Sequence, residues 1–175
     1  MPRRHAPGRR RRIIDAAIRV VGRDGIAGLS HRTVAAEADV PLGFTTYHFA
    51  TLEELLVAAL RQANENFGGV LAEVLPDDGR GDLAADLARA LGQWRGGERT
   101  GVELEYELYP PRCAAPRPVA AEWTERAAAL LARRTDPVMA RALLALPDGI
   151  CLQVLPTGGS YDEVRARALL ARLIP

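Results

Sequence analysis

The sequence of 175 residues predicts an all-α fold. Apolar residues recur at the spacing of a helix, and proline, glycine and capping residues separate the apolar segments. No alternating strand pattern and no internal repeat competes with this pattern. We expect an N-terminal domain of three helices over residues 1–50 and a larger helical domain over residues 51–175.

The first helix is predicted from an apolar stripe that ends in front of a glycine. Gly25 is suited to a left-handed cap at the end of this helix because it has no Cβ. The stripe consists of apolar residues at helical spacing, namely Ile13, Ile14, Ala17, Ile18 and Val21.

Two short helices joined by a tight turn are predicted next. Ser30 can cap the first of them, which ends at Ala38. Asp39 and Val40 form the turn, and Pro41 suits the start of the second helix because it lacks an N–H and has a fixed φ. Two helices that cross through a turn of three or four residues form a helix-turn-helix, whose second helix enters the major groove of DNA.

The second of these helices is expected to turn Thr45 and Phe49 toward the core, which leaves its other side chains outside or at the margins. Tyr47 and His48 then reach bases or the DNA backbone, and Phe44 can touch a thymine methyl group. The candidates share polar groups, aromatic rings or, for the glycine, room for close approach. They are His31, Arg32, Gly43, Phe44, Thr46, Tyr47 and His48.

Charge is unevenly distributed along the chain, although the formal net charge is only +1. Residues 1–50 hold nine arginines and four acids, and the rest of the chain holds fourteen arginines and eighteen acids. No lysine is present. A basic head of this kind suits an anionic polymer. Arg9, Arg10, Arg11 and Arg12 are expected to form a flexible arm that either adds unspecific affinity for DNA or contacts its minor groove.

From about Arg9 to Leu60 the sequence resembles the TetR family of transcriptional regulators. It departs from the family pattern at Asp39 in place of the turn glycine, at Thr45-Thr46 in place of Leu-Tyr, and at Leu52 in place of a lysine. The residues that fit the pattern or its common variants are Arg32, Val34, Ala35, Ala38, Val40, Gly43, Tyr47, His48, Phe49, Glu53 and Leu55.

The resemblance implies a homodimer that binds a palindromic operator in double-stranded DNA. It also implies repression of a nearby gene and release by a small-molecule effector, which the helical C-terminal domain would hold. The two recognition helices of such a dimer would meet half-sites about 34 to 36 Å apart. The fourth predicted helix, at residues 51–74, is shared by the N-terminal and C-terminal domains and is the expected link between effector and operator.

Beyond the head, helical spacing and punctuation by proline and glycine predict six further helices. These cover residues 51–74, 82–95, 99–109, 118–134, 136–155 and 161–173. The helix at 136–155 is apolar nearly all round, so both of its faces need covering, and Pro147 and Gly149 should kink it. The helix at 118–134 offers small residues and is the expected partner in a four-helix dimer interface.

Aromatic residues with polar tips are the candidates for an effector pocket. The pocket candidates are Phe67, Trp94, Tyr106, Tyr109 and Trp123, with Glu103 beside them. The same aromatic residues can equally be ordinary core or interface residues. Glu103 and Glu107 share a helical face and can pair with Arg95 or Arg99; the alternative is a cationic ligand.

Other functions and compartments are limited by what the sequence lacks. It has no apolar leader segment and no run of about 18 apolar residues, so we expect a cytoplasmic protein without a membrane partner. Cys113 and Cys151 lack metal or redox spacing, so no metal and no cofactor are expected. No catalytic motif occurs, and an enzyme is not expected.

An alternative function is a helical small-molecule-binding or scaffold protein without specific DNA binding. Leu42 and Leu52, which stand where relatives often have lysine, give this alternative some weight. Specific, salt-sensitive DNA binding distinguishes the regulator from this alternative.

Overall fold

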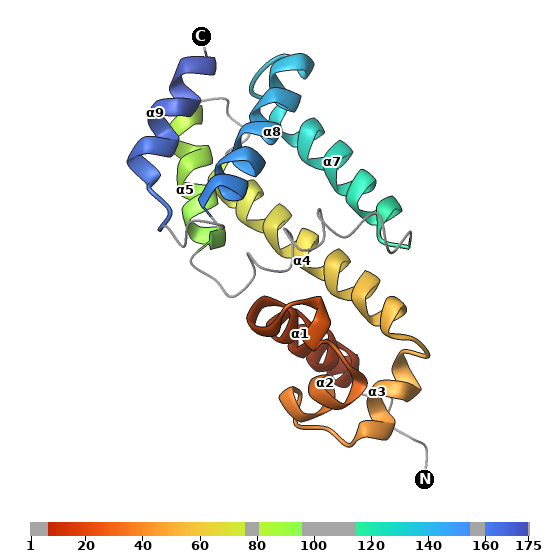
Figure 1. The fold of residues 1–175 in the computed structure, drawn as a ribbon. Coiled ribbons are helices and arrows are strands. Elements are labelled where there is room, and N and C mark those ends of the chain that lie inside the picture. Colours follow the sequence, from red (N-terminus) through yellow and green to blue (C-terminus); the bar gives the residue numbers. More distant parts are fainter. Residues whose placement is uncertain (1–6, 76–80, 96–114, 155–159, 175) are drawn as a thin grey trace. The chain divides into compact units, whose positions relative to one another are not determined.

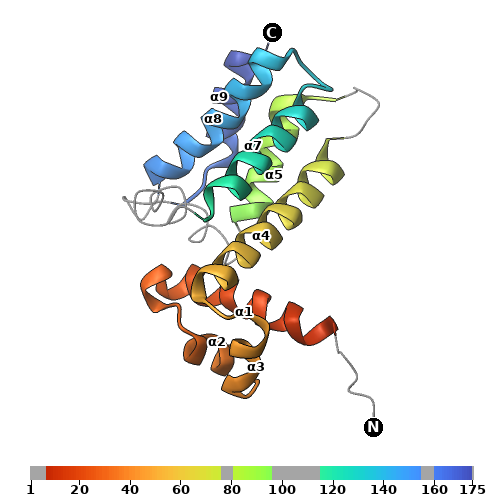
Figure 2. The ribbon, with the colours of Figure 1, turned by 90° about the vertical axis from the view of Figure 1, so that its right-hand side faces the viewer.

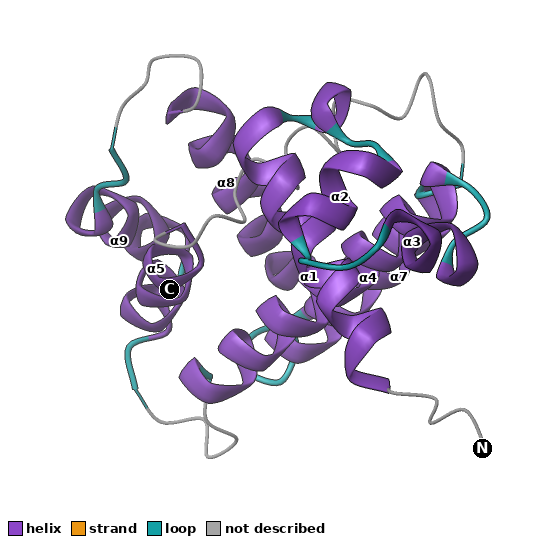
Figure 3. Cartoon of the chain, turned by 90° about the horizontal axis from the view of Figure 1, so that it is seen from below, coloured by secondary structure: helices purple, strands orange, loops and turns teal. Residues whose placement is uncertain are grey.

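The computed structural model describes residues 7–75, 81–95, 115–154 and 160–174. Within these ranges every regular element is a helix and no strand occurs, which confirms the predicted all-α class (Figures 1 and 3). The elements are α1 (Pro7–Asp24), the 3-10 helix η1 (Ile26–Gly28), α2 (His31–Glu37), α3 (Leu42–His48), α4 (Leu52–Val74), α5 (Leu83–Arg95), α7 (Arg117–Leu131), α8 (Pro137–Val154) and α9 (Glu163–Leu173).

The helices form two compact units. The first contains the described residues up to Ala63 and those from 115 to Val119, and the second contains the other described residues. The division between the units falls within helix α4, after Ala63. The division of functions at residue 50 stays a prediction.

Helix α1 supplies much of the core of the first unit. All five residues of the predicted apolar stripe are buried, and Ala16 and Val20 extend it. Val34 of α2, Phe49 at the end of α3 and Leu55 of α4 pack against the same cluster. Because removal of this surface from water is the main favourable term in folding, α1 is the helix around which α2 and α3 assemble.

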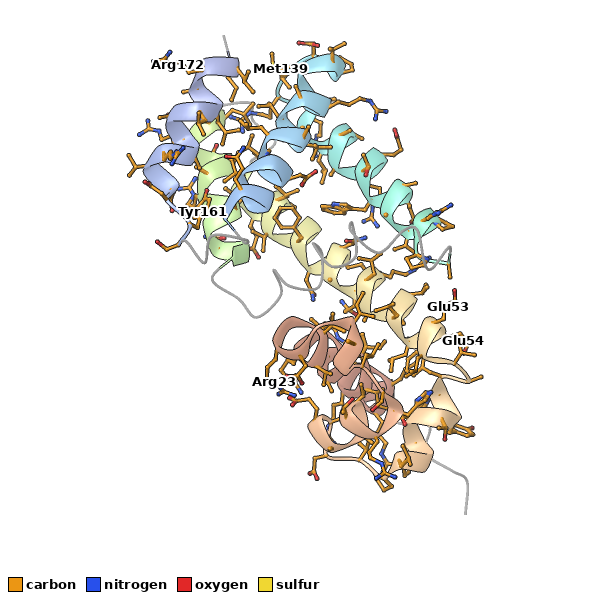
Figure 4. The ribbon with its side chains drawn as sticks, in the orientation of Figure 1. Arg23, Glu53, Glu54, Met139, Tyr161 and Arg172 are labelled. Carbon is orange, nitrogen blue, oxygen red and sulfur yellow. The ribbon has the colours of Figure 1, made fainter. Side chains whose placement is uncertain are left out.

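Local signals in the sequence set the helix ends of the first unit. Ser30 Oγ accepts from the Thr33 backbone N–H at 3.0 Å, and Thr33 Oγ1 accepts from the Ser30 N–H at 2.9 Å, a reciprocal cap of α2. Gly25 follows α1 with φ of 72°, as a glycine allows, but its ψ of 176° lies outside the left-handed helical conformation that was predicted for the cap. Glu54, labelled in Figure 4, accepts from the Ala50 N–H at 2.8 Å in front of α4.

The second unit has its own apolar core from α4, α5, α7, α8 and α9. Helix α9 packs along α5 (Figure 2). Tyr161, in the segment before α9, donates its hydroxyl to the Ala88 carbonyl of α5 at 2.7 Å (Figure 4). Asp86 of α5 is buried and is paired with Arg134 at 3.8 Å, so the carboxylate is not left without a countercharge.

The predicted helices of the second unit are confirmed within a few residues at their ends. Helix α8 includes Pro147 within its span, and the kink expected there stays a prediction. The helix predicted at 99–109 lies outside the described residues, as does Cys113. No helix in the described ranges has the length and apolar character needed to cross a membrane.

Candidate nucleic-acid interface

Helix α3 has one buried face and one exposed face. Thr45 and Phe49 are buried as predicted, and Thr45 Oγ1 donates to the Leu42 carbonyl at 2.8 Å. Phe44 and His48 are half-buried at the margins of the helix. The exposed residues, which we call the recognition face, are Leu42, Gly43, Thr46 and Tyr47. Viewed down the helix axis, neighbouring residues of this set are less than a third of a turn apart. They therefore form one continuous surface.

Tyr47 is the most exposed aromatic residue in the described chain, with 69% of its surface accessible. Its ring meets that of His48 edge to face, with the centroids 5.2 Å apart. This contact limits the rotation of both rings and holds the phenol on the recognition face. The hydroxyl can therefore donate to a phosphate or meet a base edge without large loss of side-chain entropy.

The middle of the recognition face is formed by backbone and small groups. A Cβ atom added at Gly43 would find no heavy atom within 4 Å. The fold itself therefore does not require a glycine at this position, and only an external surface would need the free space. Thr46 Oγ1 donates to the Gly43 carbonyl at 3.3 Å, which orients its hydroxyl oxygen.

The arginines before the apolar stripe lie inside α1, so the prediction that they form a flexible arm was wrong. Helix α1 begins at Pro7, a residue favoured at the first helical position, and arginine is a good helix former. Arg11 pairs with Asp15 at 3.0 Å, one helical turn later. The guanidinium of Arg9 lies 5.0 Å from the centroid of Phe44, and that of Arg10 lies 5.0 Å from the centroid of Phe49.

Arg12 is bound to the turn between α2 and α3. Its guanidinium donates to the Ala38 carbonyl at 2.8 Å, with the Asp39 carbonyl 3.5 Å away. Asp39 has φ of 51°, the left-handed region that favours glycine. Arg12 thus satisfies a carbonyl at the C-terminal end of α2, where a positive charge also complements the helix dipole.

Two more arginines of α1 hold the same end of α2 through Glu37. Arg19 Nε pairs with this carboxylate at 2.7 Å and Arg23, labelled in Figure 4, at 3.0 Å. The pKa of Glu37 is lowered mainly by the hydrogen bond from Arg19 and, to a smaller extent, by the hydrogen bond from Arg23. We call Arg12, Arg19 and Arg23 the arginine brace. Their spacing of seven and four residues places them on one side of α1, a signal that the sequence analysis missed.

The remaining head candidates lie at the start of α2. Arg32 is exposed and can approach a phosphate. His31 is half-buried, and its Nδ1 is a buried atom without a hydrogen-bond partner among the described residues. The carbonyl of His31 lies 3.4 Å from the Thr45 hydroxyl oxygen, whose proton is directed to the nearer Leu42 carbonyl, so the start of α2 lies close to the middle of α3.

Only part of the predicted effector site lies in the described residues. Phe67 of α4 and Trp123 of α7 are brought together, with ring centroids 5.4 Å apart. Trp94 lies within α5, but its side chain is outside the described part, and Glu103, Tyr106 and Tyr109 lie outside it altogether. Asp148 of α8 was not predicted; partial burial of its carboxyl raises its pKa. The described residues contain no cluster of potential metal ligands.

The helix-turn-helix, its uncharged exposed face on α3 and the arginine-rich helix behind it define a DNA-binding protein of the helix-turn-helix class. No family model matches the chain. The solved structure of SCO1917, a TetR family member from Streptomyces coelicolor A3, is 69% identical, with 97% of this chain and 99% of that chain covered and a TM-score of 0.82.

Two further relatives agree. A structure of the multidrug binding protein EbrR complexed with ethidium is 68% identical, with 97% of this chain and 100% of that chain covered and a TM-score of 0.79. The nicotine-responsive transcriptional repressor HdnoR of Paenarthrobacter nicotinovorans is 36% identical over 83 residues, which are 47% of this chain and 42% of that protein. The chain belongs to the TetR family, and it is a transcriptional regulator rather than an enzyme.

The brace makes the stability of the head depend on pH. A carboxyl whose pKa is lower in the folded than in the unfolded state stabilises the fold above its unfolded value, and this contribution disappears as the pH falls through the folded value. Glu37→Gln is therefore expected to lower the melting temperature at neutral pH. Below about pH 4.5, the melting temperature of this variant should fall less with decreasing pH than that of the wild type. Thermal unfolding followed by circular dichroism at several pH values measures both effects.

The exposed glutamate Glu65 of α4 offers a matched control. Glu65→Gln is expected to follow the wild-type curve throughout. If the melting temperatures of Glu37→Gln and the wild type changed with pH in parallel, the ion pairs of Glu37 with Arg19 and Arg23 would contribute nothing to the pH dependence of stability.

Proposed function

We propose that this protein is a homodimeric repressor that binds a palindromic operator and releases it when a small aromatic cation binds its helical body. The exposed recognition face of α3 is the observation that carries this proposal. Residues at the start and along the exposed side of a recognition helix meet base edges, and neighbouring positive and polar groups meet phosphates. DNA contacts are assigned to Arg32, Gly43, Thr46, Tyr47 and His48, with His31 and Phe44 at the margins.

The arginines of α1 differ in their availability for DNA. All four arginines from Arg9 to Arg12 are exposed, but Arg12 donates to the carbonyls of the turn, whereas Arg9, Arg10 and Arg11 do not. Guanidinium groups that lie on an aromatic ring or beside a carboxylate keep donors free for a phosphate oxygen. We therefore assign phosphate contacts to Arg9, Arg10 and Arg11 and a positioning role to Arg12.

Selection of bound fragments from sheared genomic DNA of the host tests the operator. The purified wild-type protein is expected to enrich one palindromic sequence, and Tyr47→Ala is expected to lose at least tenfold in affinity for it because a major exposed contact is removed. The affinity should also fall steeply as salt increases. Failure to enrich any sequence would contradict specific DNA binding and favour the scaffold alternative.

Two exposed stripes of small residues support the homodimer. Val138 of α8 and Val164 of α9 are each 80% exposed. Each valine is followed by exposed alanines four and seven residues later, at the same spacing in both helices. These alanines are Ala142 and Ala145 of α8, and Ala168 and Ala171 of α9.

Small residues permit close helix approach, and apolar surface of this extent favours burial against a second copy. None of the large exposed apolar residues of the described chain lies on α7. We therefore assign the interface to α8 and α9, in place of the sequence prediction of α8 with residues 118–134. A two-fold axis through these helices presents the same stripes from both copies, as an isologous interface requires.

Ala168→Glu tests this assignment, because it places a charge in the middle of the α9 stripe. It is expected to convert the dimer to a monomer in size-exclusion chromatography with light scattering. Ala129→Glu, at an exposed alanine of α7, is the matched control and should leave the dimer intact. Dissociation by Ala129→Glu alone would instead support the interface predicted from the sequence.

The effector class is inferred from the EbrR structures, which are complexes with ethidium, malachite green and proflavin. These compounds are aromatic cations. The aromatic pair Phe67 and Trp123 supplies rings that attract a cation through their faces. A cation that binds there would favour a state of the dimer with lower operator affinity.

Calorimetric titration with malachite green in the absence of DNA tests the effector class. Phe67→Ala is expected to lower the affinity about tenfold, through loss of ring contact with the cation. Val70→Ala, a truncation in the same helix and the same cluster, should change it by less than about threefold. Equal losses for the two variants would show that Phe67 acts only through packing.

A further inference from the structure

The recognition face offers few groups that can distinguish one base from another. It contains no arginine, lysine, asparagine, glutamine or acid, the side chains that form specific hydrogen bonds with guanine, adenine or cytosine. The hydroxyls of Thr46 and Tyr47 can pair with several bases. Discrimination by this face therefore needs a contact of another kind.

Leu42 is placed to make such a contact. It is the first residue of α3, and N-terminal residues of a recognition helix reach base edges. Its side chain is 46% exposed, and it is absent from the apolar cluster that includes its neighbours Val40 and Phe44. One helical turn separates Leu42 from Thr46, so the two side chains lie next to each other on the recognition face.

A single exposed leucine needs no explanation by itself. The position of Leu42 decides the case, because it lies on the same surface as Tyr47 and beside the open space at Gly43. The C5 methyl of thymine is the only apolar group that the four bases present in the major groove. Phe44, the candidate for this contact in the sequence analysis, is half-buried, with Arg9 lying on its ring.

We propose that Leu42 reads a thymine methyl group in each half of the operator. This inference rests on the proposed operator binding and adds the class of base that the head selects. Leucine contributes by removing the methyl group and its own isobutyl group from water, with no hydrogen bond involved. The selected operator is therefore expected to hold thymine at one matching position of both half-sites.

Uracil substitution isolates this contact because uracil lacks only the methyl group. Each thymine of the selected operator is replaced in turn, symmetrically in both half-sites, and affinity is measured for wild type, Leu42→Ala and Leu52→Ala. Burial of one methyl group corresponds to about fourfold in affinity, or about fifteenfold for two half-sites. At one position wild type should lose this factor, whereas Leu42→Ala should bind the thymine and uracil operators equally.

Leu52→Ala is the matched control, since Leu52 is similarly exposed at 37% but lies on α4. It should retain the wild-type preference for thymine. The proposal is overturned if no uracil substitution weakens wild type, or if every preference for thymine persists in Leu42→Ala. Absence of any selected operator for wild type would instead overturn the proposed function itself.

Discussion

The contact between the arginine brace of α1 and the C-terminal end of α2 is the constraint on which the head depends. Helix α2 has only seven residues and α3 has seven, too few for either to be stable alone in water. Their shared apolar core fixes the distance between them, but apolar contacts are not directional. Arg12 on the Ala38 carbonyl and two guanidinium groups on Glu37 add the direction, because each bond has a defined geometry.

Much of the head could be predicted because its signals are local. Ser30, Asp39 and Pro41 mark helix ends within a few residues of the bonds they make, and helical spacing alone separates Thr45 from Tyr47. The role of Arg12 could not be predicted in this way, since its partner carbonyl lies 26 residues away in the chain. Four adjacent arginines look alike in the sequence, and only the packing of α1 shows which of them donates to the turn.

The second unit shows the same limit more strongly. Apolar spacing predicted its helices, yet the pairing of Tyr161 with Ala88 joins segments 73 residues apart. The sequence placed Phe67 and Trp123 among several aromatic candidates, and their contact follows only from the packing of α4 against α7. The exposed stripe of α9 was missed because alanine and arginine alternate along it, which hides its apolar side in a simple count of apolar residues.

Structural and recognition roles fall on different residues of the head. Thr45, Phe49 and the arginine brace hold α3 in place, and none of them belongs to the recognition face. Substitutions at Leu42, Thr46 or Tyr47 are therefore expected to leave the stability of the domain nearly unchanged. A lineage of such proteins can change its operator preference through single substitutions on this face without first acquiring compensating stability, so regulators of this design are free to diverge toward new target genes.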